Sequence, residues 1–397
     1  MKKALVLLLN LFLITGAVQA EKKDAIITGA DQTSLYLPYL KGKRIGMLVN
    51  QTSIIGKRSS VDSLQSVGVS IVAIFGPEHG FRGNASNGAA VSDETDDKTG
   101  IPVISLYGKK NKPTKEDMDK IDLMIFDLQD VGCRFYTNIN VLARVMEACA
   151  ENGKELLILD RPNPNAYIDG PVLDMKFKSG IGMFPIPITH GLTIGEFAQM
   201  INGQGWLANK EQCKLKIIKV KNYSHAMYYE LPVHPSPNLN TQQSILLYPS
   251  LCPFEGTIIS QGRGTYMPFT VLGAPLLKGK YDFSFKPVSI QGMSEAPLHQ
   301  DQDCYGLDLR NYDAKKLWAS GKIDIKWMID LYSAYPDKAK FFDATQSKAM
   351  GRIEARMGTD QFQKQVEAGM SEAEIRKSWE PGLSEYKKMR LQYLLYP

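Results

Sequence analysis

The sequence predicts an α/β fold, with a parallel-sheet domain followed by a smaller α+β domain. Short apolar runs rich in β-branched residues alternate with helical patterns up to residue 160, which is typical of a parallel sheet with right-handed crossovers. Polar residues follow the carboxyl ends of these runs, where open α/β sheets bind their ligands. Beyond residue 165 the alternation stops, and prolines and glycines become frequent.

The first twenty residues have the pattern of a signal peptide. Lys2 and Lys3 precede an apolar run at 4–14, and residues 18–20 are suited to a cleavage site ahead of Glu21. The run is too short to span a bilayer as a mature helix, and no cysteine lies near the cut to carry a lipid. We therefore expect an exported protein, periplasmic or secreted, without a stable membrane anchor.

The remaining chain is long enough for about two domains. We place the boundary where the alternation of strand and helix patterns stops and prolines and glycines become frequent. This gives one domain at 21–167 and a second at 168–397. Hydrophobic residues make up 44% of the chain and charged residues 22%. These fractions are ordinary for globular proteins and exclude a disordered or fibrous chain.

Charge, cysteine and glycine patterns exclude several partners and cofactors. The net charge is +5 without a stripe of lysine and arginine, so no nucleic-acid partner is expected. The five cysteines are widely spaced and lack a C-x-x-C pattern, and no H-E-x-x-H occurs, so no metal is expected. Buried apolar cysteines are predicted, with one disulfide as the alternative.

Residues 50–53 follow the first strand without a glycine fingerprint, which argues against a dinucleotide enzyme. No cofactor is predicted.

Apolar runs predict five strands in the first domain. They lie at 44–50, 69–75, 101–107, 123–127 and 156–160. Helical spacing of apolar residues predicts helices at 60–67 and 141–151, and Thr114 begins an acidic helix. We expect the polar residues that end these strands to meet at one edge of the sheet.

The second region has fewer regular patterns. Apolar spacing predicts a helix at 193–203, a strand at 215–220 and a strand-like stretch at 281–290. Ser371 and Glu374 have the spacing of a capping box, which predicts the start of a helix near the end of the chain.

The stretch GPEHGFRG at 76–83 is the first candidate site. Its glycines let backbone approach a ligand, and its proline stiffens the turn. Glu78 is the candidate acid or base, because shielding by neighbouring phenylalanines raises a carboxyl pKa as general acids require. His79 either orients Glu78 or contacts substrate. The alternative is a solvated turn with a structural histidine.

A second cluster of polar residues follows the strand at 123–127. Its candidate residues are Gln129, Asp130, Arg134, Tyr136 and Asn138. Carboxylate, amide and aromatic groups of this kind hold sugars. Two interpretations stay open for Arg134: it pairs with Asp130, or it joins Arg82 in binding a substrate carboxylate.

A third group lies among the glycines and prolines of the second region. It contains His190, Asn238, Glu255, Gln261 and Arg263. The Gly-Arg-Gly at 262–264 lacks the spacing of a phosphate-binding loop, and a G-x-S-x-G nucleophile elbow is absent from the chain. The sequence therefore gives no support to phosphate binding or to a serine esterase.

Five motifs together resemble one known family. They are GPEHGFRG at 76–83, DLQDVGCRFYT at 127–137, PSPNL at 235–239, YPSLCPFEGT at 248–257 and GRGT at 262–265. In this order they are similar to the motifs of the NamZ-type exo-β-N-acetylmuramidases, formerly the DUF1343 family of unknown function. The resemblance extends from about Lys41 to the end of the chain.

The resemblance implies a Rossmann-like amino-terminal domain, a smaller carboxyl-terminal domain and an active-site cleft between them. It also implies removal of single N-acetylmuramic acid residues from non-reducing ends of peptidoglycan fragments. Glu78 matches the family's proposed catalytic glutamate. We assign catalysis to Glu78, His79 and Asp130. We assign substrate binding to Arg82, Gln129, Arg134, Tyr136, Asn138, His190, Asn238, Glu255 and Arg263.

The second catalytic group stays open at this point. A glycosidase needs a carboxylic acid to protonate the leaving oxygen, and most also use a second carboxylate. Asp130 or Glu255 would supply it, or the 2-acetamido group of the substrate would attack instead. The lactyl carboxylate of muramic acid calls for an arginine, which would be Arg82, Arg134 or Arg263. A non-catalytic wall-sugar binding protein and a hydrolase of wall peptides are the rival functions.

Overall fold

The computed structural model describes residues 25–77, 81, 94–108, 110–343 and 352–397. Three of the predicted site residues, Glu78, His79 and Arg82, lie outside the described residues, as does the predicted signal peptide. No helix in the described ranges is both long and apolar enough to cross a membrane.

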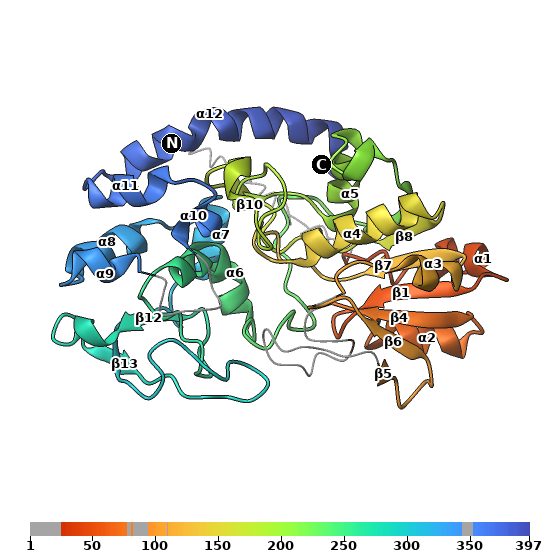
Figure 1. The fold of residues 1–397 in the computed structure, drawn as a ribbon, viewed down its shortest axis with the longest axis horizontal. Helices are drawn as coiled ribbons and strands as arrows, with labels where there is room; N and C mark the ends of the chain where they lie inside the picture. The colour runs from red at the N-terminus through yellow and green to blue at the C-terminus, as the bar shows by residue number, and fades with distance from the viewer. Residues whose placement is uncertain (1–24, 78–80, 82–93, 109, 344–351) are drawn as a thin grey trace, which may run out of the picture.

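A seven-stranded sheet forms the centre of the first domain (Figure 1). Its strands are β1 (Ile45–Val49), β4 (Ile71–Gly76), β5 (Glu94–Thr95), β6 (Pro102–Ser105), β7 (Leu123–Asp127), β8 (Glu155–Leu159) and β11 (Lys214–Ile218). The strand order is β11-β8-β7-β1-β4-β6-β5, and all pairs are parallel except β5 with β6. From β1 the chain first builds β4 and β6 on one side, and then β7, β8 and β11 on the other. The strand order therefore reverses between β1 and β7, where doubly wound sheets bind ligands.

Alternation along the strands places apolar side chains on both faces of the sheet. Met47 and Val49 belong to the core beneath α1 (Leu37–Leu40) and α2 (Ser60–Ser66). Leu48, between them, belongs to the core beneath α4 (Asn138–Glu151) and α5 (Ile194–Gly203). Because both faces are covered by helices, the strands are apolar throughout, as is typical of parallel sheets.

Short elements complete the first domain. They are β2 (Ile54–Ile55), β3 (Arg58–Ser59), α3 (Lys115–Asp119), β9 (Ile168–Asp169) and β10 (Thr189–His190). Thr114 precedes α3, as predicted, and caps it by a reciprocal pair of hydrogen bonds with Asp117. The predicted strands of this domain are confirmed to within two residues at most ends, and α4 begins three residues before its predicted start.

The second domain is smaller and mostly helical. Its helices are α6 (Gln242–Leu251), α7 (Ala314–Ala319), α8 (Lys326–Ala334), α9 (Lys338–Phe341), α10 (Ile353–Met357), α11 (Gln361–Glu367) and α12 (Glu372–Arg390). An antiparallel sheet has the order β12 (Val271–Ala274), β14 (Cys304–Asp308), β13 (Phe283–Phe285). The strand-like stretch predicted at 281–290 is therefore regular only at β13. The boundary predicted between 167 and 168 precedes β11, which pairs with β8 in the large sheet.

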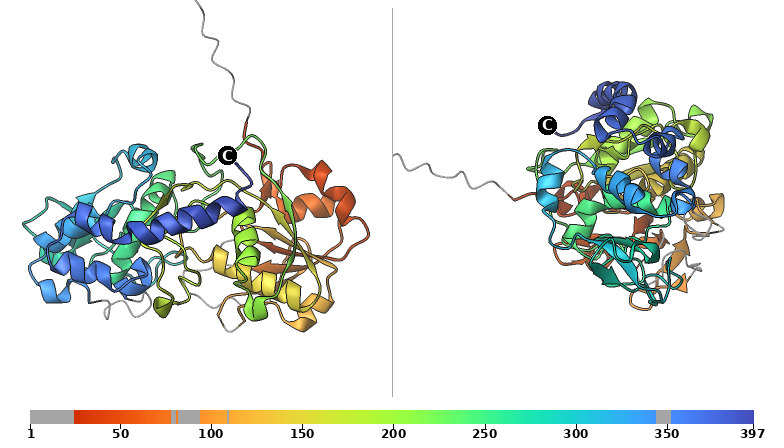
Figure 2. Two further views of the ribbon diagram at one scale, coloured as in Figure 1. Left: turned by 90° about the horizontal axis from the view of Figure 1, so that it is seen from above. Right: turned by 90° about the vertical axis from the view of Figure 1, so that its left-hand side faces the viewer.

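The terminal helix α12 lies across both domains (Figures 1 and 2). Ile375 and Trp379, near its start, pack in the core of the second domain. Tyr386, two turns later, packs in the core of the first domain and donates a hydrogen bond to the carbonyl of His190. The predicted Ser371–Glu374 capping box begins this helix. One continuous helix thus holds the two domains together.

All five cysteines are buried free thiols. This placement agrees with the predicted role as small apolar residues, and none of the five, which all lie in the described residues, forms a disulfide.

The last residues of the chain pack against the first domain at Asp160, the residue directly after β8. Tyr396 donates a hydrogen bond to Asp160 Oδ2 at 2.6 Å and accepts one from the amide of Val220 at 3.0 Å. Thr193 donates to the same carboxylate oxygen at 2.7 Å. Burial raises the pKa of Asp160 to about 6, although these donors pull it downward.

Tyr396→Phe should lower the free energy of unfolding by ~1–3 kcal/mol, because a buried carboxylate loses a donor and an amide loses an acceptor. The loss should be larger at pH 7.5 than at pH 5. The raised pKa of Asp160 means that its charged form, which needs the donor most, prevails only above about pH 6. Urea unfolding at both pH values measures the effect, with Tyr312→Phe, at a partly exposed tyrosine, as control. Equal losses at the two pH values would contradict the assignment.

Candidate active site

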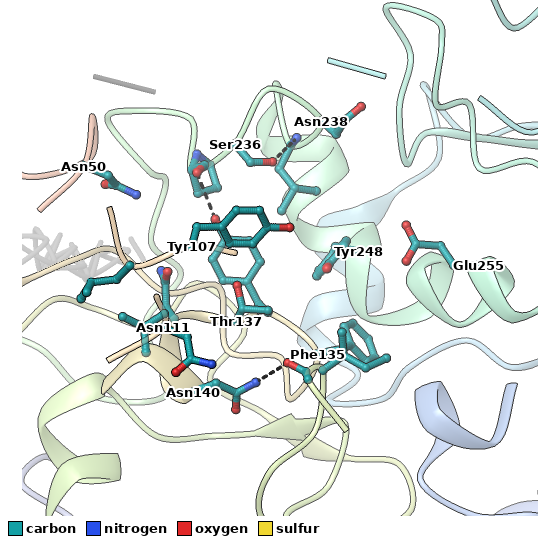
Figure 3. A pocket seen from close by; sticks show the side chains of 18 of the residues that line it. Asn50, Tyr107, Asn111, Phe135, Thr137, Asn140, Ser236, Asn238, Tyr248 and Glu255 are labelled. Atoms are coloured by element: carbon teal, nitrogen blue, oxygen red, sulfur yellow. Dashed lines mark hydrogen bonds between the residues drawn. The ribbon is translucent and has the colours of Figure 1, made fainter. Parts of the chain in front are cut away.

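A cavity of about 700 Å³ lies between the two domains, and its volume is typical of a small-molecule site. Figure 3 shows Asn50, Asn111 and Asn140 on one side and Tyr248 and Glu255 on the other. The cleft expected between the domains is therefore present. Of the predicted site residues, those that line it are Tyr136, Asn138, Asn238, Glu255 and Arg263.

The first domain supplies one wall from the carboxyl ends of its strands. Asn50 directly follows β1, and Leu106 and Tyr107 follow β6. Residues 135–137 lie between β7 and α4, and Asn138 begins α4. β1 and β7 are adjacent in the sheet, at the point where the strand order reverses. The wall is therefore built where the topology of a doubly wound sheet leaves a crevice.

The edge of this wall is close to the undescribed stretch that contains Glu78. β4 ends at Gly76, and the carbonyl of Gly76 accepts a hydrogen bond from the amide of Leu106 at 2.8 Å. Leu106 itself lines the cavity. The last residues described before Glu78 thus lie beside the cavity edge.

Aromatic rings from both domains form the floor of the cavity. Tyr248 on α6 contacts Phe135 and Tyr136 edge-to-face, with centroid distances of 5.4 and 6.2 Å, and Phe269 at 4.9 Å. Tyr136 also donates a hydrogen bond to the carbonyl of Pro235 at 3.0 Å, which anchors the segment that carries Asn238. Flat aromatic surfaces beside amide groups suit a ligand that is partly apolar and rich in hydroxyls.

Two arginines share Glu255 in the wall of the second domain. Arg263 donates from Nε to Glu255 Oε1 at 2.8 Å, and Arg356 Nη2 lies 2.6 Å from Glu255 Oε2. Burial alone would raise the pKa of Glu255, but the fields of Arg263 and Arg356 outweigh it and lower the pKa below its usual range. Glu255 is therefore a carboxylate at neutral pH and is unsuited to donating a proton.

Two glycines fix the turn that carries Arg263. Gly262 and Gly264 have φ values of +78° and +79°, a region that other residues rarely adopt. A Cβ atom on Gly264 would lie 2.5 Å from Pro297 Cγ. The Gly-Arg-Gly motif is thus a tight turn that places Arg263 in the cavity wall, and it is not a phosphate-binding loop.

Arg134 lies in the protein interior instead of the cavity. The loop after β7 packs Val131, Cys133 and Phe135 into the core of the second domain, so the side chain of Arg134 between them is fully buried. Its guanidinium donates to the carbonyls of Pro171, Ile186 and Arg356 at 2.7–2.8 Å. The predicted substrate contact is therefore replaced by a structural role, which includes fixing the backbone of Arg356.

Arg134→Met should lower the free energy of unfolding by ~3 kcal/mol or more, because three buried carbonyls lose their donor at ~1–3 kcal/mol each. Denaturant unfolding monitored by tryptophan fluorescence measures the change. Arg352→Met is the control, since the Arg352 side chain is 82% exposed, and it should shift stability by no more than ~0.5 kcal/mol. Equal stability of the two variants would contradict the structural role.

Gln129, Asp130 and His190 are also buried, and none of them lines the cavity. Gln129 donates to the carbonyls of Asp130 and Pro162. Asp130 accepts a hydrogen bond from the amide of Gly132, and its Oδ2 lies 3.7 Å from His190 Nε2. These three predicted site residues shape the loop behind the wall, and no Asp130–Arg134 pair forms among the described contacts.

Polar lining residues that were not predicted as site residues include Asn140, Arg144 and Arg356. Asn140 and Arg144 follow Thr137 at intervals of three and four residues, which places all three on one face of α4. That spacing was a usable signal. Arg356 had none, because α10 contains no motif and reaches the cavity only through tertiary packing.

The described part of the chain holds no group of three or more His, Cys, Asp or Glu side chains placed to bind a metal ion.

Comparison with known proteins assigns the family. Residues 45–243 match the family model described as exo-beta-N-acetylmuramidase NamZ, N-terminal, and residues 246–396 match its C-terminal counterpart. A Bacillus subtilis protein named peptidoglycan beta-N-acetylmuramidase NamZ is 39% identical, over 95% of this chain and 93% of its own length.

Two crystal structures of DUF1343 family proteins from Bacteroides fragilis are also similar. One has a TM-score of 0.85 and 44% identity, and the other has a TM-score of 0.79 and 28% identity. Each match covers 94% of this chain and 99% of the other chain. On these findings the chain belongs to the exo-beta-N-acetylmuramidase NamZ family and is a glycoside hydrolase.

Proposed function

We propose that this protein releases N-acetylmuramic acid from the non-reducing ends of peptidoglycan fragments, with Glu78 as general acid and base. The name of the Bacillus subtilis relative supports the substrate class. The role of Glu78 is supported by the composition of the cavity wall. Glu255 is the single carboxylate among its described residues, and two arginines hold it ionised. The proton for the leaving oxygen must therefore come from another group.

Glu78 is suited to that role by its position in the sequence. It follows Gly76 by two residues, and Gly76 is bonded to a residue of the cavity edge. Glu78 and Asp93 are the only acidic residues in the sequence from 78 to 93. Of these two, Glu78 is nearer along the chain to the described edge of the cavity.

The nucleophile in this proposal is the 2-acetamido group of the substrate. Asp130 does not line the cavity, and Glu255 is fully engaged with arginines. The acetamido oxygen would attack the anomeric carbon while Glu78 protonates the departing oxygen. Glu78 would then deprotonate the water that opens the cyclic intermediate. Two displacements at one carbon retain its configuration, so the first product should be the β-anomer, which proton NMR detects before mutarotation.

The experiment for the function uses two disaccharides that differ in sequence. MurNAc-β-1,4-GlcNAc should be hydrolysed to equal amounts of its monosaccharides, whereas GlcNAc-β-1,4-MurNAc should remain intact. Chromatography of the products measures both. Hydrolysis of the second disaccharide at a comparable rate would overturn the proposed specificity, and binding without turnover of the first would overturn the proposed reaction.

We also propose that the protein is exported, periplasmic or secreted, on the pattern of its first twenty residues. Mass spectrometry of the protein from its native cells should find Glu21 at the mature amino terminus. A cytoplasmic protein that retains residues 1–20 would contradict export.

A further inference from the structure

The cavity wall carries more positive than negative charge. Its described charged residues are Arg144, Arg263, Arg356 and Glu255. Glu255 is shared by Arg263 and Arg356, and Arg144 forms no ion pair within the described residues. Because a partly buried site screens charge less than water does, this excess favours an anionic ligand.

The Arg263–Glu255–Arg356 triad also has hydrogen-bond donors without acceptors. Arg263 Nη1 and Arg356 Nε are buried and have no partner in the described part of the chain. Buried donors in native proteins nearly always have partners, because leaving one unpaired costs free energy. Both arginines line the cavity, so the triad brings unused donor capacity to a wall where an oxyanion can bind.

The guanidinium of Arg263 is held in place before a ligand arrives. Glu255 binds its Nε and Nη2 edge. Phe269 lies under its plane, with 5.0 Å between Cζ and the ring centroid. The glycines on both sides of Arg263 have positive φ and are closely packed, Gly262 against Met267 and Gly264 against Pro297. A donor group fixed in this way loses little entropy when it binds an oxyanion.

We propose that the Arg263–Glu255–Arg356 triad is the subsite for a ligand carboxylate and that Arg263 is the residue that recognises the lactyl carboxylate of the terminal muramic acid. This inference rests on the proposed function and adds its specificity determinant. The two arginines and the one glutamate of the triad carry a net positive charge, which one ligand carboxylate balances. Glucosamine, which lacks the lactyl group, would leave that charge and its donors unpaired, and sites built in this way reject such analogues strongly.

The test compares two forms of MurNAc-β-1,4-GlcNAc, one with a free lactyl carboxylate and one with the carboxylate converted to a methyl amide. The wild-type enzyme should prefer the free acid. Arg263→Gln should lower kcat/KM for the acid by ~10–10²-fold, the equivalent of a lost hydrogen bond to a charged group, and should change kcat/KM for the amide far less. The ratio of kcat/KM for the acid to kcat/KM for the amide should therefore fall in Arg263→Gln.

Arg263→Lys keeps the charge and should retain part of this preference, which also covers the case in which Arg263→Gln fails to fold. Arg310→Gln is the matched control, because Arg310 is an exposed arginine that pairs with Asp308 on the surface, and it should leave the ratio unchanged. A merely structural role for Arg263 would lower both rates together and keep their ratio.

An unchanged ratio in both Arg263 variants would overturn the inference, as would loss of the preference in Arg144→Gln alone. The same preference is measured as a ratio of Kd values by calorimetry, which needs no turnover. If the wild type binds the acid more tightly but hydrolyses neither form, the proposed function fails and the carboxylate subsite stands.

Discussion

Glu78→Gln should lower hydrolysis of MurNAc-β-1,4-GlcNAc by ~10²-fold or more while leaving the fold intact, because the amide cannot protonate the leaving oxygen. KM should change little, since glutamine keeps the size and polarity of the side chain. Initial rates from chromatography of the released monosaccharides measure the effect, and circular dichroism verifies the fold.

Asp93→Asn provides the matched control for Glu78→Gln. It makes the same acid-to-amide change in the stretch from 78 to 93, and it should retain near-wild-type activity. A loss in Asp93→Asn as large as that in Glu78→Gln would indicate a second catalytic carboxylate and contradict the acetamido mechanism. Near-full activity of Glu78→Gln would remove Glu78 from the mechanism.

Glu255→Gln should lower the free energy of unfolding at pH 7 by ~3–5 kcal/mol, because it leaves two buried arginines without their shared counterion. The pKa of Glu255 is lowered in the folded protein, so its stabilising charge is present above the unfolded pKa of about 4.3 and is lost as the pH falls through the folded pKa. The stabilities of the wild type and of Glu255→Gln should therefore converge below about pH 4.3.

Urea unfolding between pH 3.5 and 7.5 measures this convergence. Asp330→Asn is the control, because Asp330 pairs with Lys326 on the exposed face of a helix, and such pairs contribute at most ~1 kcal/mol. A difference between wild type and Glu255→Gln that stays constant with pH would show that shape rather than charge gives Glu255 its role.

Five strands of the parallel sheet could be predicted because their signals are local, whereas β11 was expected in the second domain. Each strand is a short apolar run, and each helix that follows it has regular apolar spacing, so local and tertiary preferences agree. The second domain was harder to predict. α6 has a proline inside it, at Pro249, and the short strand β13 lies at the edge of its sheet, paired with β14. Their regularity comes from tertiary contacts that a single sequence does not display.

The candidate site was predicted in part for a related reason. Tyr136 and, at the start of α4, Asn138 line the cavity, whereas Gln129, Asp130 and Arg134 from the preceding loop are buried behind it. A polar motif at a strand end usually indicates an exposed loop, but this loop passes through the junction between two cores. Its polar groups therefore satisfy backbone carbonyls and amides, and the sequence alone does not separate the two roles.

A crystal structure of Glu78→Gln in complex with MurNAc-β-1,4-GlcNAc is the most direct test of the central claim. We expect the muramic acid ring in the cavity between the domains, its lactyl carboxylate bonded to Arg263, and the side chain of residue 78 within ~2.6–3.2 Å of the glycosidic oxygen. A disaccharide bound outside this cavity, or bound within it with residue 78 beyond reach of that oxygen, would contradict the account.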